Sequence, residues 1–154
     1  MSETNREADF EDSATLGATE EIALSPWVVL KFGGTSVSST ANWETIAGLV
    51  RARLAAGLRP VIVHSALSGV SNALEETLAS AVGGDPAAGL EQIRKQHCDL
   101  ASALGLDGEE ILGERLHELE QLIAGVRLVK EVSVRVRVRV MALGELMSTL
   151  LGAA

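Results

Sequence analysis

The segment from Lys31 to Val37, with the sequence KFGGTSV, holds the residues best suited to chemistry. A lysine closes the apolar run Trp27–Leu30, and two adjacent glycines and two hydroxyl residues follow it. Glycines let the backbone approach a ligand closely and adopt dihedral angles closed to other residues. Consecutive backbone N–H groups form a concave anion site, to which a lysine adds positive charge. The segment therefore predicts a phosphate-binding loop, with contacts from Lys31, Gly33, Gly34, Thr35 and Ser36.

The order of the residues in this loop separates it from a Walker A loop, in which the lysine follows the glycines. A simpler alternative stays open. The same residues fit a tight strand-to-helix turn whose lysine side chain only extends its ammonium group into water.

A second polar loop, residues 65–72 with the sequence SALSGVSN, follows the apolar stretch 60–64. Ser71 is a candidate N-cap for a helix that we predict over residues 73–82. The free N–H groups and positive dipole end of that helix would face an anion at the same place as the first loop. Taken alone, the loop also fits an ordinary polar connection. His64 before it is more typical of a packed histidine than of a catalytic base.

The two loops need a scaffold that brings them together, and the apolar runs 27–30 and 60–64 predict one as two buried strands. An amphipathic helix over 40–56 separates them, with N-cap candidates at 38–40 and Gly57 as its C′ glycine. A strand–helix–strand unit of this length implies a parallel sheet with a right-handed crossover. Ligands bind outside the carboxyl ends of such strands, where both loops lie.

The rest of the chain reads mostly as helix. A Gly/Pro-rich break at 83–89 precedes two helical stretches, 89–104 and 108–131, which predict an αα-hairpin packed beside the sheet. Residues 132–140 alternate strictly between valine and a polar residue, a period that predicts a β-strand with three arginines on one face. Residues 141–151 then read as helix, so strand and helix compete at this point.

Composition excludes several classes of function. The net charge of −8 and the 3% of aromatic residues argue against binding nucleic acid. The single cysteine, Cys98, excludes an internal disulfide framework, and His97 and His117 lack a matching set of metal ligands. The sequence shows neither a membrane-spanning run nor a signal peptide, so we expect a cytoplasmic protein. Residues 1–25 are strongly acidic and predict a disordered leader before one ordered domain, 26–154.

Three motifs together resemble the aspartate kinases of the amino acid kinase family. They are KFGGTSV at 31–37, SALSGVSN at 65–72 and GELMS at 144–148, in the family's order and rough spacing. The segments WVVLK and HSAL are similar to the bacterial form fused to a diaminopimelate decarboxylase. The resemblance covers residues 27–154. It implies an α/β fold, part of the three-layer αβα amino acid kinase fold with a mainly parallel sheet.

The resemblance also implies the reaction, transfer of the γ-phosphoryl group of ATP, bound with Mg²⁺, to the side-chain carboxylate of L-aspartate. Lysine, threonine and methionine are made from the product. Lys31 would stabilise the moving phosphoryl group, and Gly33 and Gly34 would donate backbone N–H groups to it. Ser65 would lie near the phosphate and aspartate, and Ser71 and Glu145 would bind aspartate, Glu145 through its α-ammonium group. The complete enzyme would be a homo-oligomer.

The chain also departs from the family pattern. Ser71 stands where the family has a threonine, and Val134 where a proline is common, although the family favours a helix over about 135–151. The chain stops at Ala154, before the family's second half, so we expect a fragment without kinase activity by itself. A non-catalytic binding or assembly module, and a kinase of the same fold with another acceptor, remain alternatives.

Overall fold

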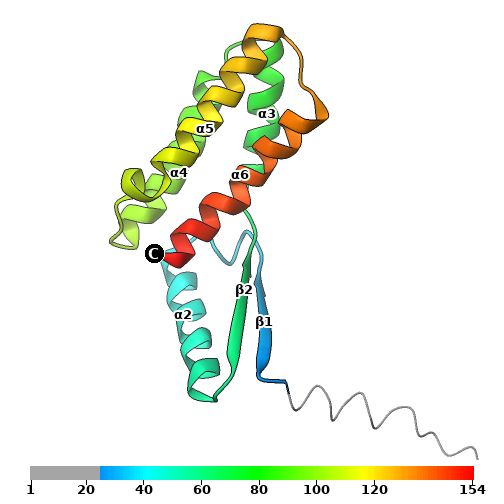
Figure 1. The fold of residues 1–154 in the computed structure, drawn as a ribbon. Helices are drawn as coiled ribbons and strands as arrows, with labels where there is room; N and C mark the ends of the chain where they lie inside the picture. Colours follow the sequence, from blue (N-terminus) through cyan, green and yellow to red (C-terminus); the bar gives the residue numbers. More distant parts are fainter. Residues whose placement is uncertain (1–24) are drawn as a thin grey trace, which may run out of the picture.

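The computed structural model describes residues 25–154; nearly all of the predicted acidic leader lies outside this range. A two-stranded parallel sheet with one helix forms one end of the molecule, and a bundle of four helices forms the other (Figure 1). In chain order the elements are β1 Trp27–Phe32, α2 Thr40–Ala55, β2 Arg59–His64, α3 Val70–Gly83, α4 Ala87–Ala103, α5 Gly108–Val129 and α6 Val134–Ala153.

The predicted strand–helix–strand unit is confirmed. Strands β1 and β2 run parallel, and Phe32 at the end of β1 lies beside His64 at the end of β2. The Ser39 side chain caps α2 by accepting a hydrogen bond from the backbone N–H of Asn42. Gly57 follows the helix with φ of 76°, a left-handed conformation that favours glycine. The ends of both strands, and hence the two polar loops, therefore lie side by side.

The prediction that both strands are buried is wrong, because no residue of either strand is buried and Ile62 is 38% exposed even on the covered face. Leu30 and Ile62 share the face on which α2 packs. Val29 and its partner Val61 share the opposite face, where they are 66% and 41% exposed. Within residues 25–154 nothing covers that face, so the apolar residues of each strand divide between a packed side and a solvent side.

The predicted helical hairpin forms from α4 and α5, but its predicted place beside the sheet is wrong. It packs on α3 and α6 instead, at the end of the sheet (Figure 1). The physical reason is that the apolar side chains of the hairpin, among them Leu112 and Ile123, are already buried against α3 and α6. The buried side chains of these four helices include Leu74, Ile93, Leu112, Ile123 and Met147.

The strand predicted from the alternating valines is wrong, because residues 134–140 are the first two turns of α6. The Ser133 side chain caps this helix. Val140 is fully buried, whereas Val138 is 63% exposed, so the burial follows a helical and not an alternating period. No basic stripe forms, since Arg137 pairs with Glu75 on α3 and Arg139 with Glu118 on α5. The helix that the family pattern favours is confirmed.

Within residues 25–154 no helix has both the length and the apolar character that crossing a bilayer requires.

Candidate functional site

The first loop leaves β1 at Lys31 and Phe32 and turns at once. The backbone N–H of Ser36 donates to the carbonyl of Gly33 at 2.9 Å, which closes the turn. Val37 then anchors the loop, because its side chain is fully buried and its carbonyl accepts a hydrogen bond from the Trp43 indole at 2.9 Å. Lys31 itself is exposed on the open face of the sheet, so its ammonium group is accessible to a ligand.

The two glycines serve the loop differently from the way the sequence predicts. Neither has a positive φ, so the expectation of a backbone conformation closed to other residues is wrong. Gly34 is required by close packing: a Cβ atom there would lie 2.7 Å from the carbonyl oxygen of Ala66 in the second loop. A Cβ atom on Gly33 would meet nothing within 4 Å, so this glycine borders open space.

The loop keeps donors free for a ligand. Among the hydrogen bonds of residues 25–154, none uses the backbone N–H of Gly34 or Thr35. The carbonyl of Thr35 is held by the Asn42 amide at 2.9 Å, which fixes the loop against α2. Lys31 has no ion pair within the same residues. Two unpaired N–H groups that follow an unpaired lysine within four residues are the donor types that an anion site uses.

The second loop starts at Ser65, whose backbone N–H extends the sheet by donating to the carbonyl of Phe32 at 3.1 Å. The half-buried Ser65 therefore lies beside the start of the glycine loop. The prediction of Ser71 as an N-cap is wrong, because α3 begins earlier, at Val70, with Gly69 as its N-cap at φ of 83°. Ser71 lies in the first helical turn instead. No side chain caps α3; the N–H of Val70 donates to the Leu67 carbonyl at 3.1 Å, and those of Ser71 and Asn72 have no partner among residues 25–154.

The third motif comes from α6. A Cβ atom on Gly144 would lie 3.0 Å from the Cβ of Ala66 and 3.3 Å from side-chain carbons of Val70 and Leu74. Glycine thus lets α6 pack closely on the second loop and on the start of α3. The next residue, Glu145, is exposed and has no ion pair among residues 25–154. The fold therefore brings all three sequence motifs together around Ala66, which contacts both Gly34 and Gly144.

Three residues that hold the loops together were not predicted as part of the site: Ala66, Ser38 and Gln96. The Ser38 hydroxyl bonds to both loops, and the Gln96 amide on α4 donates to the carbonyl of Ser68 at 2.9 Å. Ser38 was visible in the sequence only as a helix-cap candidate. Ala66 and Gln96 carry no signal of their own, because their roles depend on contacts between distant segments.

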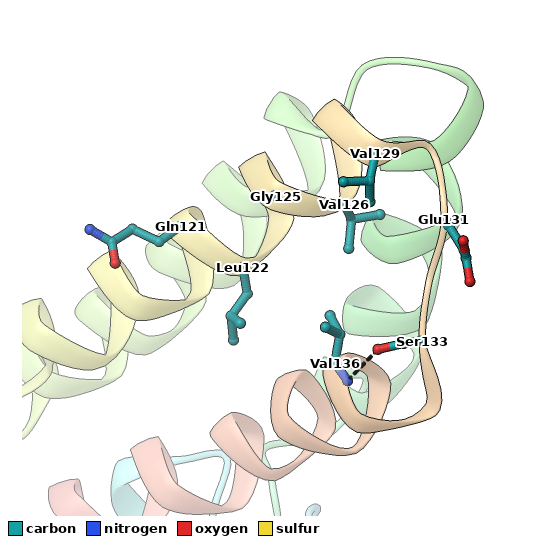
Figure 2. Close-up of a pocket in the computed structure, with 8 residues that line it drawn as sticks. All are labelled: Gln121, Leu122, Gly125, Val126, Val129, Glu131, Ser133 and Val136. Atoms are coloured by element: carbon teal, nitrogen blue, oxygen red, sulfur yellow. Dashed lines mark hydrogen bonds between the residues drawn. The ribbon is translucent and has the colours of Figure 1, made fainter.

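The cavities of the structure coincide only in part with the three motifs. One of about 240 Å³ is lined by Thr35 and Ser36 of the glycine loop and by residues of α2, including Asn42 and Thr45. A larger one of about 470 Å³ lies between the end of α5 and the start of α6. Figure 2 shows its apolar side chains, among them Leu122 and Val136, and none of the predicted site residues. Its lining contains no cation, so it does not suit phosphate.

The titratable side chains outside the motifs have structural roles. His64 packs edge-on against Trp43 with ring centroids 5.0 Å apart, and burial lowers its pKa. His97 is fully buried, with Nδ1 2.8 Å from the Ile93 carbonyl, and burial lowers its pKa too. Burial raises the pKa of the Cys98 thiol, which makes it a weaker nucleophile. Within residues 25–154 no three acidic, histidine or cysteine side chains are placed to hold a metal ion.

Comparison with known proteins identifies the family to which this fold belongs. The sequence profile of the amino acid kinase family matches residues 26–154. The chain belongs to the amino acid kinase family. It is 35% identical to chloroplastic aspartokinase 3 of Arabidopsis thaliana over 82% of the chain, and 34% identical to chloroplastic aspartokinase 1 over 96% of it. These matches cover 23% and 26% of the two relatives, so the chain spans about a quarter of their length.

Solved structures agree with the sequence comparison. E. coli aspartokinase III in complex with aspartate and ADP superimposes with a TM-score of 0.66 and 30% identity over 80% of the chain. The match covers 27% of that enzyme. A second structure of E. coli aspartokinase III, with lysine and aspartate, gives the same TM-score. The resemblance to aspartate kinases and the predicted α/β amino acid kinase fold are therefore confirmed.

Proposed function

We propose that this chain forms the phosphate- and aspartate-binding part of an aspartate kinase. Such an enzyme transfers the γ-phosphoryl group of ATP to the side-chain carboxylate of L-aspartate. The observation that carries the proposal is the meeting of three motifs around Ala66: the free N–H groups after Lys31, the second loop, and Glu145 on α6. The aspartate and ADP in the similar E. coli enzyme support it.

Phosphoryl transfer requires positioning and neutralisation of charge more than covalent help from the protein. The exposed Lys31 supplies the positive charge for the moving phosphoryl group. The backbone N–H groups of Gly33 and Gly34 donate to it, and the hydroxyls of Thr35 and Ser36 add further donors. The ammonium group of Lys31 forms no ion pair within residues 25–154, so it gives up no protein partner when it binds a phosphoryl group.

Aspartate carries one ammonium group and two carboxylate groups, and the chain offers partners for the ammonium group and one carboxylate. Glu145 accepts hydrogen bonds from the α-ammonium group, and its carboxylate is exposed and unpaired among residues 25–154. The hydroxyls of Ser65 and Ser71, together with the uncapped N-terminus of α3, bind a carboxylate of the substrate. The contact of Gly144 with Ala66 and Val70 places Glu145 next to this loop, where both ends of one small amino acid can be held.

The magnesium ion is proposed to arrive with ATP. No three candidate ligands within residues 25–154 are grouped to hold a metal ion, whereas the phosphates of ATP bind Mg²⁺ themselves. We further propose a place in the biosynthesis of lysine, threonine and methionine and a homo-oligomeric complete enzyme, as the aspartate kinase resemblance implies. The cytoplasmic location stays a proposal that rests on the sequence pattern alone.

Ligand titrations of the isotope-labelled 154-residue chain test the two half-sites separately. Lys31→Met should weaken binding of inorganic phosphate, and Glu145→Gln should weaken binding of L-aspartate, each with little effect on the other ligand. Both side chains are exposed, so the free energy of unfolding should not change. The matched controls are Lys95→Met and Glu44→Gln, which change exposed residues outside the three motifs. Equal effects of the control and site variants would contradict the proposal.

Phosphoryl transfer itself is tested in a chimaera in which residues 26–154 replace the matching part of E. coli aspartokinase III. Hydroxylamine traps the acyl phosphate as a hydroxamate. Removal of one electrostatic stabiliser typically lowers kcat about 10²–10³-fold, and we expect that loss for Lys31→Met. A folded, active chimaera that keeps its kcat after this substitution would remove the assigned role of Lys31.

A second candidate, a non-catalytic assembly module, has one observation in its favour. Val29, Val61 and Val63 leave an apolar strand face exposed, and such faces often bind another protein. Sedimentation of the chain with and without Val29→Lys tests it. Self-association that this variant abolishes, together with no binding of phosphate or aspartate, would favour the module over the kinase.

A further inference from the structure

The two loops of the proposed site are joined by a single hydroxyl group. Ser38 follows the glycine loop, and its Oγ donates to the carbonyl of Gly34 at 2.5 Å. The same oxygen accepts a hydrogen bond from the backbone N–H of Ser68 at 2.8 Å. Ser38 and Ser68 are 30 residues apart in the chain, so this bond links the segment after β1 to the segment after β2.

The next peptide group, between Ser68 and Gly69, is held as well. Its carbonyl accepts a hydrogen bond from the side-chain amide of Gln96 on α4 at 2.9 Å. The next residue, Gly69, has φ of 83°, and α3 begins immediately after it. The position of Ser68 therefore fixes where the N-terminus of α3, with Ser71 in its first turn, lies relative to the glycine loop.

The bond from Ser38 to Gly34 also orients a donor, together with a longer bond from the Val37 N–H to the same carbonyl at 3.3 Å. The carbonyl of Gly34 and the N–H of Thr35 belong to one trans peptide and point in opposite directions. Because the carbonyl is turned toward Ser38, the N–H of Thr35 is turned away from it, and it has no partner among residues 25–154. Only a side chain that both donates and accepts a hydrogen bond can hold the two loops in this way.

We propose that Ser38 is a positioning residue of the site: its hydroxyl sets the orientation of the phosphate-binding N–H groups and their separation from the aspartate-binding loop. This inference rests on the proposed function, since it assigns the two loops to two ligands. Ser38 touches neither ligand. It acts through the backbones of Gly34 and Ser68.

The test uses the 154-residue chain and three variants. Ser38→Ala removes the link, and Ser38→Thr keeps a hydroxyl that can donate and accept. Ser39→Ala is the matched control, because Ser39 caps α2 and its loss weakens the helix without touching the second loop. For each protein, NMR gives the dissociation constants of inorganic phosphate and L-aspartate and the hydrogen-exchange rate of the Ser68 amide, at a temperature where all are folded.

We expect Ser38→Ala to raise both dissociation constants about three- to tenfold, the equivalent of one lost hydrogen bond. The Ser68 amide should exchange faster in this variant. Ser38→Thr should restore both properties, and Ser39→Ala should leave both unchanged. A purely structural role would make Ser38→Ala and Ser39→Ala alike. If Ser38→Ala does not fold, Gln96→Ala tests the same residue through its carbonyl and should weaken binding in the same direction.

The outcomes separate this inference from the proposed function. Faster exchange at Ser68 with unchanged dissociation constants would overturn the positioning role and leave the proposed function intact. Unchanged exchange at Ser68 in Ser38→Ala would overturn it as well. Failure of the unmodified chain to bind either ligand, with the Ser68 amide protected, would instead refute the proposed function while showing that the link between the loops exists.

Discussion

The adjacent glycines Gly33 and Gly34 give a matched pair for testing how the loops pack. A methyl group on Gly34 would lie 2.7 Å from the carbonyl oxygen of Ala66 and 3.4 Å from the backbone nitrogen of Ser68. All of these atoms belong to the backbone, so no side-chain rotation relieves the contact. A methyl group on Gly33 meets nothing within 4 Å. Because neither residue has a positive φ, alanine is compatible with the backbone at both.

The size of the effect follows from three contributions. Overpacking costs about 1–3 kcal/mol, and we take roughly 2 kcal/mol here. Separation of the loops also lengthens the hydrogen bond from Ser68 to Ser38, at a cost of about 1 kcal/mol. Replacing glycine by alanine also lowers the conformational entropy of the unfolded chain, which stabilises the folded state by about 0.4–1 kcal/mol. Gly34→Ala should therefore lower the free energy of unfolding by about 2 kcal/mol, whereas Gly33→Ala should leave it unchanged or raise it slightly.

Urea unfolding followed by circular dichroism at the helical band measures both variants. With an m-value of about 2 kcal/mol/M, the midpoint of Gly34→Ala should fall by about 1 M. The m-value should stay constant, since the same surface is exposed on unfolding. Equal midpoints for the two variants would refute the close contact between Gly34 and Ala66, and with it the convergence of the loops around Ala66.

Three further predictions concern titration, the helix α6 and turnover. Burial lowers the pKa of His97, so the unfolded state binds a proton on this residue more tightly than the folded state does. The free energy of unfolding should therefore be constant above the unfolded pKa of about 6.5 and should fall as the pH drops below it. His97→Met should flatten this fall when urea unfolding is measured between pH 7.5 and about 5.5. Val140→Ala should cost about 2 kcal/mol in urea unfolding, and Val138→Ala almost nothing, whereas a strand at 132–140 would make the two similar. The 154-residue chain should bind L-aspartate but form no hydroxamate with ATP and hydroxylamine, because Lys31 and Glu145 are both open to water. A hydroxamate signal that Lys31→Met abolishes would overturn this prediction.

The chemistry of the site was predicted from contiguous residues, and it stays a prediction. The order of lysine, glycines and hydroxyls at 31–37 indicates an anion site, since all its donors come from one short loop. The strand–helix–strand unit was also predictable, and so was the second helix of the hairpin, predicted over 108–131, because caps and apolar spacing act within a few residues. Even the placement of the two loops at one edge followed from the rule that parallel strands end together.

The alternating valines of residues 132–140 show where a local pattern fails. Valine at every second position satisfies a strand, yet Val136 and Val140 also lie one helical turn apart. Tertiary contacts decide between the two: the cap at Ser133, the burial of Val140 in the bundle and the ion pairs of Arg137 and Arg139 with two other helices. None of these partners is visible in the segment itself.

The assembly of the site was likewise decided only by the tertiary structure. The sequence by itself determined which residue types stand at 31–37, 65–72 and 144–148, and so which ligand groups they suit. It did not determine that Gly34 and Gly144 both meet Ala66, or that Ser38 holds the peptide of Ser68. These residues are separated by 30 or more positions, and their contacts exist only because β1 pairs with β2 and α6 packs back across the loops. Propensity acts on neighbours in the chain, whereas close packing acts on neighbours in space.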